Sequence, residues 1–377
     1  MLPVWTIVYF NVENRPRRSW PLQRCLMVKI MQTFLDVVSK TGSFRMDEPD
    51  IEQWGRNPEL MKKHGMVWVE ARPYVLVDAL KEAAKVNGVK PVRLPGFWVG
   101  KRDSAGFVGQ RAGPDEKVIY HLFGGGHIMS NGSPKGVAQV LCKDFLKHFH
   151  CFERVFLIDH RRAQGPPLEP KNAFPSAVID AISGYDYLVK DLGFKPENIL
   201  VTGDSAGASL AIQLVRALRD HPSLNMGIPG GVMPISPYVD AGKSNFGPHS
   251  SLLTNWDSDL VHFILGIYPV QAYLGSLPMS EASTNPWIAP VSLRLSTPYG
   301  HFKDFPPTYL IVGDAEMFLD ENRLLRDRII QDTDASRVTY REVIDGTHPS
   351  TMAMGHPAEL EETLRLMAIW VSEVFDK

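Results

Sequence analysis

The chain has 377 residues, 44% of them hydrophobic and 22% charged, with a formal net charge of −2. This composition is typical of soluble globular proteins and allows one large α/β domain or two smaller ones. The near-zero charge argues against a nucleic-acid partner, because no cationic excess is present to neutralise phosphates. The 3 cysteines lack Cys-x-x-Cys spacing, which indicates a reducing compartment and favours neither a disulfide framework nor a zinc site.

The beginning of the sequence does not have the pattern of a secretion signal. Leu2 to Phe10 is apolar but short, and no small-residue cleavage site follows it. No stretch approaches the length of a transmembrane helix, so we expect a soluble, cytoplasmic protein. From Leu22 to Val38, apolar residues recur every three or four positions, which predicts one apolar helical face. This helix packs on the body of the protein, covers an apolar site, or rests on a membrane surface beside the nearby arginines.

The middle and end of the chain alternate between strand and helix patterns. Residues 43–90 are mostly polar, with one helix expected from Tyr74 to Lys85. Lys90 to Val99 contains Pro91 and Pro95 and is expected to be an edge strand or irregular chain. The expected strands after it span residues 117–123, 154–159, 198–202, 230–236, 307–313 and 337–343. The expected helices span residues 133–150, 174–192, 206–218, 258–274, 319–332 and 358–375.

Strands that alternate with helices in this way indicate βαβ units and a mostly parallel sheet. Residues 241–290 interrupt the alternation with a polar loop and an extra helix. We therefore expect two parts: an N-terminal cap or helical extension over residues 1–90, and an α/β domain over residues 91–377. The cap insertion within the second part is expected at about 241–290.

Ser205 stands at the junction of an expected strand and helix, within Gly203-Asp-Ser-Ala-Gly207. A serine on so sharp a turn has a strained backbone, and the flanking glycines leave room for the strand and helix to close around it. Its hydroxyl is then accessible to a base, and main-chain N–H groups at the helix start face the same space. The same residues also fit a helix cap without chemistry, because serine is a good N-cap.

Polar residues follow the last two expected strands at the sheet edge where open α/β sheets carry function. Asp314 and Glu316 follow one strand, and His348 follows the other. Serine, then carboxylate, then histidine is the chain order of a nucleophile–acid–base triad on this architecture. The imidazole accepts the serine proton, and the carboxylate fixes the imidazole tautomer. A glycine triplet at residues 124–126 allows main-chain N–H groups to approach an oxyanion, and it lacks the spacing of a nucleotide loop.

Taken together, these motifs resemble the hormone-sensitive-lipase-like family of esterases and lipases over about residues 90–375. The matching segments are Phe123-Gly-Gly-Gly126, Asp159-His-Arg-Arg-Ala163, Phe174 to Asp180, Gly203-Asp-Ser-Ala-Gly207, Asn285-Pro286, Glu316 to Glu321 and His348. The resemblance implies an α/β-hydrolase fold with a mostly parallel central sheet flanked by helices, and a helical cap.

The resemblance also implies a role for each matching residue. Ser205 would be the nucleophile and His348 the general base. The family's acid lies four residues before an aspartate, which is Asp320 here, so Glu316 would be the acid and Asp314 the fallback. The remaining assignments are Gly125, Gly126 and Ala206 as oxyanion-hole N–H donors, Asp204 as support beside the nucleophile, and Asp159, Arg161 and Asp180 as braces of the fold.

Two segments depart from the family pattern. Phe123 stands where the family has the first residue of His-Gly-Gly-Gly, with His121 and His127 close by. The family's Asp-Tyr-Arg-Leu-Ala-Pro-Glu is altered to Asp-His-Arg-Arg-Ala-Gln-Gly from Asp159 onward. We expect the oxyanion hole to be kept, because its donors are main-chain groups, and we expect the bracing of its loop to differ.

We therefore expect a serine hydrolase that cleaves carboxylic esters through an acyl-enzyme, without a metal or organic cofactor. The apolar 22–38 face and the 263–268 segment are expected to line an acyl pocket. An acyltransferase, a lactonase or a lactone-forming cyclase could use the same acyl-enzyme, and a non-catalytic ligand-binding protein is the alternative of another class. The expected partner is a small-molecule ester or acyl substrate. Contact with a membrane surface through the N-terminal helix and a homodimer both stay open.

Overall fold

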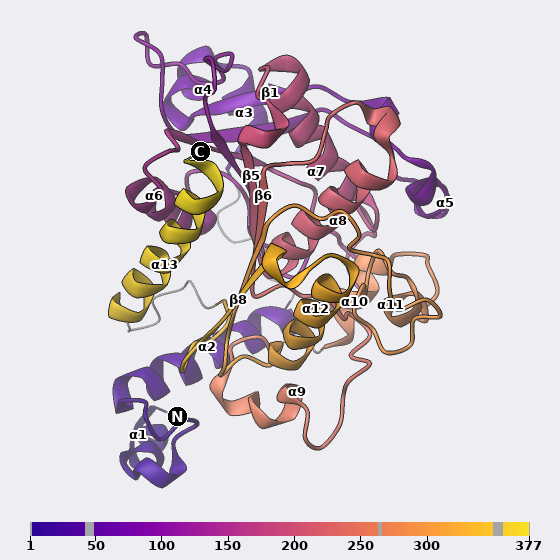
Figure 1. Ribbon diagram of the computed structural model, residues 1–377. Helices are drawn as coiled ribbons and strands as arrows, with labels where there is room; N and C mark the ends of the chain where they lie inside the picture. Colours follow the sequence, from indigo (N-terminus) through magenta and orange to yellow (C-terminus); the bar gives the residue numbers. More distant parts are fainter. Residues whose placement is uncertain (1, 42–48, 263–265, 350–356, 377) are drawn as a thin grey trace.

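A computed structural model describes residues 2–41, 49–262, 266–349 and 357–376 (Figure 1). Its described strands form one sheet in the order β1-β2-β4-β3-β5-β6-β7-β8. The strands β3 to β8 run parallel, whereas β1 pairs antiparallel with β2 and β2 with β4. Their bounds are Met66–Val69, Leu94–Gly100, Val118–Leu122, Arg154–Ile158, Ile199–Asp204, Gly231–Ile235, Thr308–Gly313 and Val338–Val343. The expected mostly parallel sheet is confirmed.

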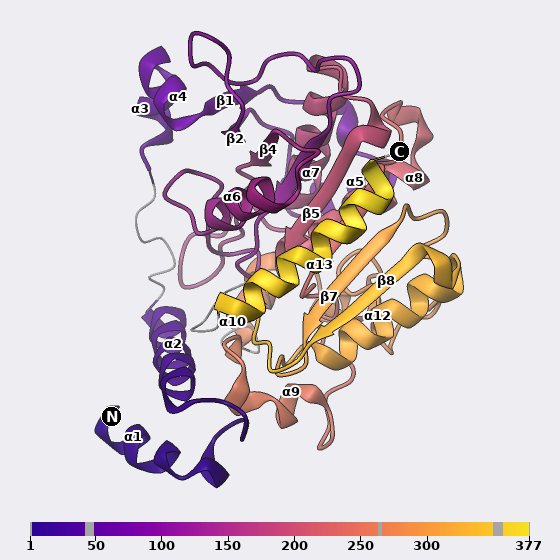
Figure 2. The same ribbon diagram turned by 60° about the vertical axis from the view of Figure 1, so that its left-hand side comes forward.

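Helices cover both faces of this sheet. On one face, α6 (Ala138–His148) and α13 (Pro357–Phe375) pack apolar side chains against the strands. On the other face lie α7 (Ser176–Asp186), α8 (Ala206–Asp220) and α12 (Leu319–Asp332). Figures 1 and 2 show α13 crossing one side of the strands while α12 lies beside β7 and β8. The result is a three-layer α/β arrangement in which the carboxyl ends of the parallel strands share one edge.

The remaining helices lie outside these layers. The N-terminal ones are α1 (Leu2–Phe10), α2 (Leu22–Thr41), α3 (Ile51–Gly55), α4 (Pro58–His64) and α5 (Asp78–Val86). Between β6 and β7 lie α9 (Ser251–Thr254), α10 (Ile267–Leu274) and α11 (Glu281–Thr284). These three short helices occupy the expected cap insertion.

The structure differs from the expected elements in three places. The sheet begins with β1, before the expected boundary at residue 90. The segment expected to be an edge strand or irregular is β2, which pairs on both sides. Pro95 fits there because its carbonyl accepts a hydrogen bond from Asp159 N (2.9 Å), which requires no N–H of the proline. Instead of a helix from residue 258, α10 begins at Ile267, where Pro269 falls in the tolerant first turn.

Helices α1 and α2 lie at one end of the molecule, apart from the strands, whereas α3 and α4 lie beside β1 (Figures 1 and 2). The buried side of α2 carries Cys25 and Val28, which pack with Leu260 and Ala315. These contacts place α2 behind the loops that follow β6 and β7, so it is not a free arm. Residues 263–265, half of the expected acyl-pocket segment, lie outside the described residues.

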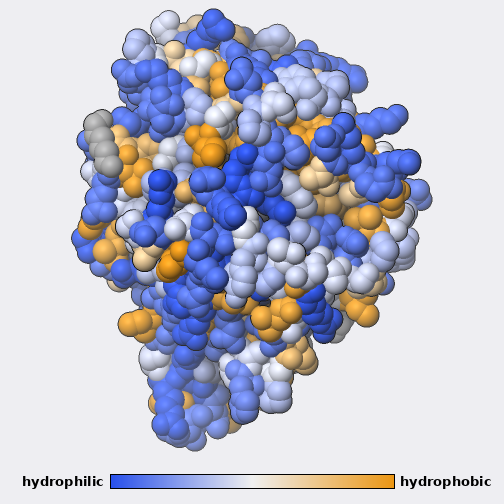
Figure 3. All heavy atoms as spheres, turned by 45° about the vertical axis from the view of Figure 1, so that its right-hand side comes forward, coloured by the Kyte–Doolittle hydropathy of each residue, from blue (hydrophilic) through white to orange (hydrophobic). Residues whose placement is uncertain are grey.

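The surface is mainly polar on the face seen in Figure 3, where apolar residues are scattered in small groups. Helix α1 is different, because Leu2, Val4, Ile7 and Phe10 on it are all exposed. Among the described helices, none combines the length and the apolar character needed to cross a bilayer.

Candidate active site

Ser205 occupies a strained turn between β5 and α8. Its φ of 54° and ψ of −121° are unfavourable for a residue with a side chain, and such conformations cost about 1–3 kcal/mol each. The glycines on either side permit the turn. A Cβ on Gly203 would lie 2.4 Å from the Gly207 carbonyl oxygen, and a Cβ on Gly207 would lie 2.0 Å from the Leu122 carbonyl oxygen. Strand, turn and helix therefore close as the sequence predicts.

The main chain of Ser205 is fixed on both sides of the turn. Its N–H donates to the Ile235 carbonyl (2.8 Å), and its carbonyl accepts from Tyr238 N (3.2 Å). Ala206 is the first residue of α8. Its N–H therefore has no partner within the helix and points toward the helix entrance.

Glu316 and His348 form a buried pair at the same sheet edge. His348 Nδ1 lies 2.9 Å from Glu316 Oε2, and the two residues are 3% and 0% exposed. The other carboxylate oxygen of Glu316 accepts from Ser236 Oγ (2.7 Å) and from Gly313 N (2.6 Å). Both oxygens of this buried carboxylate are thus hydrogen-bonded, which is the condition for keeping a charge out of water.

The surroundings of His348 favour its protonated form. Burial alone would lower the pKa of His348, but the hydrogen bond and charge of Glu316, supported by Asp259 and Asp204, raise it above its ordinary value. An imidazole that gains a proton here is therefore stabilised by the neighbouring carboxylates. This is the electrostatic arrangement that a general base requires when it takes a proton from a hydroxyl.

A chain of ring contacts connects the serine turn to the histidine loop. Tyr238, whose N–H bonds to Ser205, stacks on Phe318 with ring centroids 5.2 Å apart. Phe318 meets His348 edge to face at 5.0 Å. Because β5 and β8 are parallel members of one sheet, both residues also lie at its carboxyl edge. The structure thus brings Ser205, Glu316 and His348 to one region.

The glycine loop after β3 packs directly on the serine turn. Gly124 N donates to Asp204 Oδ1 (3.0 Å), and a Cβ on Gly124 would lie 3.0 Å from Ser205 Cβ. Gly125 and Gly126 have φ values of 112° and 60°, which glycine adopts without strain. Within the described residues, their N–H groups make no hydrogen bond. They are therefore available as donors beside the turn, like Ala206 N.

The two departures from the family pattern face one another. The rings of Phe123 and His160 stack with centroids 3.9 Å apart and an interplanar angle of 13°. His160 Nε2 also lies 3.1 Å from the Phe123 carbonyl oxygen. Burial lowers the pKa of His160 to about 4, so the ring is neutral and donates its N–H to that carbonyl. His160 thus braces the glycine loop from outside it.

Residues expected to support the fold have that role. Asp180 forms a bidentate pair with Arg161, and Asp159 accepts from Gly132 N (2.9 Å). Within the described residues, the fallback acid Asp314 makes no hydrogen bond to the His348 ring, and its Oδ1 accepts from Asp345 N (2.7 Å). Its role is therefore to fix the loop before His348.

Ser236, His160 and Asp259 are site residues that the sequence reasoning missed. Ser236 directly follows β6 and His160 is the second residue after β4, so their position near a strand end could have identified them. Asp259 lies in the polar loop of the cap, where no periodic pattern singles it out. Only the folded chain reveals that it contacts the His348 loop.

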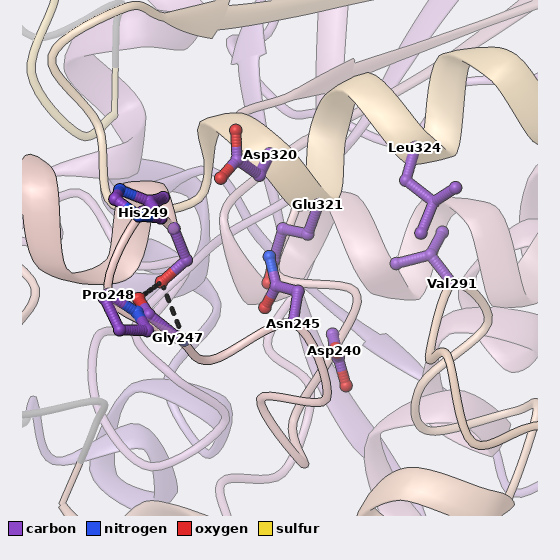
Figure 4. A pocket seen from close by; sticks show the side chains of 10 residues that line it. Asp240, Asn245, Gly247, Pro248, His249, Val291, Asp320, Glu321 and Leu324 are labelled. Carbon is purple, nitrogen blue, oxygen red and sulfur yellow. Dashed lines mark hydrogen bonds between the residues drawn. The ribbon is translucent and has the colours of Figure 1, made fainter.

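A separate hollow of about 330 Å³ opens beside the first turn of α12 (Figure 4). Asp320 and Glu321 face it, and both carboxylates already have main-chain partners. Asp320 Oδ2 accepts from Ser251 N (2.7 Å) and Glu321 Oε1 from Val239 N (3.0 Å). These acids therefore fasten α12 to the cap segment. Within the described residues, no His, Cys, Asp and Glu side chains are grouped as a metal site.

Comparison with known proteins supports the sequence resemblance. A family model described as the alpha/beta hydrolase fold matches residues 118–352. An esterase of Acinetobacter venetianus is 28% identical over 215 residues, which are 57% of this chain and 62% of that protein. The esterase LipU of Mycobacterium tuberculosis is 26% identical over 211 residues, 55% of this chain and 62% of that protein. The match thus spans 62% of the length of these curated relatives.

Solved structures confirm the expected fold. An esterase from the bacterial hormone-sensitive lipase family superposes with a TM-score of 0.58 at 20% identity, over 95% of this chain and 99% of that protein. An esterase/lipase from an uncultured bacterium gives a TM-score of 0.60 at 20% identity, over 95% and 100% of the two chains. At these identities, the likeness establishes the α/β-hydrolase fold.

Of three buried histidines, His348 is expected to titrate at a higher pH than His127 and His160. The pKa of His348 should lie above its ordinary value of 6.5, whereas burial lowers the pKa of His127 to about 3 and of His160 to about 4. NMR titration of the chain with labelled histidine rings measures all three midpoints. Substitution Glu316→Gln should lower the His348 midpoint and leave the other two unchanged. A His348 midpoint below 6.5 in the unsubstituted chain would contradict the charge environment described above.

Proposed function

The chain belongs to the α/β-hydrolase-fold family whose model matches residues 118–352, and from this premise we propose that it is a serine hydrolase of carboxylic esters. Ser205 is the nucleophile, His348 the general base and Glu316 the acid. Gly125, Gly126 and Ala206 supply the oxyanion-hole N–H groups. The reaction passes through an acyl-enzyme and requires no metal or organic cofactor.

The observation that carries the proposal is the buried Glu316–His348 hydrogen bond of 2.9 Å at the sheet edge where Ser205 stands. A histidine that only supports the fold does not require a buried carboxylate partner with both oxygens hydrogen-bonded. A serine that only caps a helix has an extended backbone and not a φ of 54°. Strain and a buried, charge-stabilised imidazole at one place are the features that nucleophilic catalysis requires.

In the acylation step, Ser205 Oγ attacks the ester carbonyl carbon and His348 Nε2 takes the hydroxyl proton. The imidazolium that forms is stabilised by Glu316 through Nδ1, which also fixes the tautomer with Nε2 free to accept. The carbonyl oxygen becomes an anion and is held by main-chain N–H groups, each of which contributes roughly 10²- to 10³-fold to the rate. His348 then gives its proton to the leaving alcohol, and the acyl group remains on Ser205.

In the deacylation step, water takes the place of Ser205 as the nucleophile, and Ser205 Oγ becomes the leaving group. Neutral His348 removes a proton from water, and the hydroxide attacks the acyl carbon. The tetrahedral intermediate uses the same oxyanion donors as before. Its collapse returns the proton to Ser205 Oγ and releases the carboxylic acid. If an alcohol or amine enters in place of water, the same residues carry out acyl transfer or lactone formation.

The substrate class proposed is a small-molecule carboxylic ester. The support comes from the relatives in Acinetobacter venetianus and Mycobacterium tuberculosis, which are both named esterases. The buried face of α2 packs on Leu260 and Ala315, next to the loops of the proposed acid and base. We propose that α2 forms part of the wall of the acyl site, while residues 263–265 lie outside the described residues.

We also propose that a lipid surface is contacted by α1, which precedes the 22–38 helix for which the sequence leaves membrane contact open. Val4, Ile7 and Phe10 on this helix are 60%, 75% and 77% exposed, and the nine residues of α1 include no charged side chain. An apolar helix at one end of the molecule, followed by the exposed Arg18, fits a bilayer interface. The helix would lie in the interface and leave the sheet outside it.

A fluorophosphonate probe should label the native chain at Ser205, because the probe reacts only with an activated serine hydroxyl. Mass mapping of the label identifies the residue. The substitution Ser205→Ala should abolish labelling and lower kcat/KM for p-nitrophenyl butyrate by roughly 10⁴-fold or more. Ser209→Ala is the matched control one helical turn later, and it should still be labelled at Ser205. An unlabelled Ser205 in the folded chain would overturn the proposed function.

The identity of the acid can be separated by comparing two neighbouring carboxylates. Glu316→Ala should lower kcat by roughly 10³- to 10⁴-fold, because the imidazole loses its orienting partner. Asp314→Ala should change kcat by less than about tenfold, since Asp314 supports a main-chain N–H and not the ring. Steady-state rates with p-nitrophenyl esters measure both. Loss of turnover only in Asp314→Ala would show that the acid is assigned wrongly.

Sedimentation with phosphatidylcholine vesicles tests the lipid contact. The double substitution Ile7→Glu and Phe10→Glu should weaken binding by more than about tenfold, because two apolar side chains lose their burial. Val140→Glu on α6 removes an equally exposed apolar residue elsewhere (63%) and should leave binding unchanged. Equal sedimentation of all three chains would refute the contact. Light scattering without vesicles distinguishes self-association through the same surface.

A further inference from the structure

Asp259 is a fully buried carboxylate in the cap segment between β6 and β7. It lies in the long connection that follows β6, far along the chain from Ser236 at the end of that strand. Its Oδ1 accepts hydrogen bonds from Leu260 N (2.7 Å) and from His348 N (3.0 Å). Its Oδ2 accepts from Met317 N (2.6 Å). Three main-chain donors therefore converge on one side chain.

Two of these donors lie in the proposed triad or next to it. His348 N belongs to the general base itself, and Met317 directly follows the acid Glu316. One carboxylate thus joins the main chain of the loop after β7 to the main chain of the loop after β8. Any movement of one loop relative to the other must break a charge-assisted hydrogen bond. The distance between the acid and the imidazole is therefore fixed by a third residue.

The segment that carries Asp259 is itself firmly attached. Asn255 Nδ2 donates to the carbonyls of Asp314 (3.0 Å) and Glu316 (2.7 Å), and Ser258 Oγ donates to the Ala315 carbonyl (2.9 Å). These bonds thus hold the carbonyl groups of three consecutive residues in the loop after β7. From the outside, Gln32 of α2 donates to the Asp259 carbonyl (2.6 Å). The carboxylate is therefore held in place independently of the histidine.

We propose that Asp259 is a positioning residue of the catalytic triad: it fixes the main chains around Glu316 and His348 to one another and supports the imidazolium by its charge. This inference rests on the proposed function, because it assigns Asp259 a part in the same reaction. Asp259 touches neither the ester nor the serine hydroxyl in this role. It acts only through the position and the charge environment of His348.

The charge of Asp259 is stabilised by its hydrogen bonds. Burial raises the pKa of Asp259, the charge of His348 lowers it and the charge of Glu316 raises it. The three main-chain N–H donors to this carboxylate favour its ionised form. The charged groups facing His348 are Glu316 after β7, Asp259 from the cap and Asp204 at the end of β5. Loss of the negative charge of Asp259 must therefore lower the pKa of His348.

The substitution Asp259→Asn tests both parts of the role. Its amide group turns one acceptor into a donor, which opposes the N–H of Met317 or of His348. A shifted imidazole should lower kcat for p-nitrophenyl butyrate by about 10- to 100-fold, with KM changed less than about twofold. The acid limb of kcat/KM and the NMR midpoint of His348 should both move down by about half a pH unit or more. Asp257→Asn, in the same segment but exposed, is the control and should change neither.

The His348 midpoint decides the outcome. A downward shift in Asp259→Asn supports the proposal, and an unchanged midpoint overturns it, whatever the effect on kcat. If Asp259→Asn does not fold, Asp259→Glu decides. This substitution keeps the charge, but its longer side chain displaces the carboxylate from Met317 N and His348 N. A reduced kcat with the wild-type midpoint then supports the role, and any other result overturns it. The midpoint needs no turnover, so failure of the proposed function, seen as an unlabelled Ser205, is distinguishable from failure of this inference.

Discussion

The hydrogen bond between Glu316 and His348 is the constraint on which the rest of the site depends. A carboxylate removed from water costs several kcal/mol unless its oxygens are bonded. Glu316 meets this condition with partners from three strand ends: Ser236 after β6, Gly313 at the end of β7 and His348 after β8. The three loops must therefore assume their positions together. Correct placement of the acid is thus a consequence of correct sheet order.

The N-terminal segment completes the same polar network, although it adds no strand to the parallel part of the sheet. Arg17 donates to the Asp314 carbonyl, Arg24 to the Asp345 carbonyl and Gln32 to the Asp259 carbonyl. Each of these carbonyls belongs to a loop around the acid or the base, and leaving one buried without a partner would cost about 1–3 kcal/mol. Helix α2 and the turn before it therefore stabilise the loops of the proposed triad from behind. This explains why an apolar helix at the edge of the fold carries buried arginine and glutamine side chains.

Features encoded over a few adjacent residues could be predicted from the sequence, and features made by distant segments could not. The Ser205 turn is local, because the two glycines and the strand–helix change stand within one short stretch. Glu316 is implied by the family resemblance, through its spacing from Asp320 within one short stretch after β7. In contrast, β2 became an interior strand because β1 covers it, and no property of residues 94–100 contains that information. Asp259 belongs to the same class, since its three donors come from positions up to 89 residues away.

Phe123 and His160 show why single departures from a family pattern mislead when they are read separately. Phe123 alone implies a glycine loop without its bracing histidine, and His160 alone implies a changed side chain after β4. Together they form a stacked pair whose imidazole also bonds the Phe123 carbonyl, so a histidine still holds the loop. Its pKa of about 4 keeps this ring neutral where His348, with its raised pKa, changes charge. The brace of the glycine loop and the proposed catalytic base therefore titrate in different ranges, and the loop stays fixed while His348 gains and loses its proton.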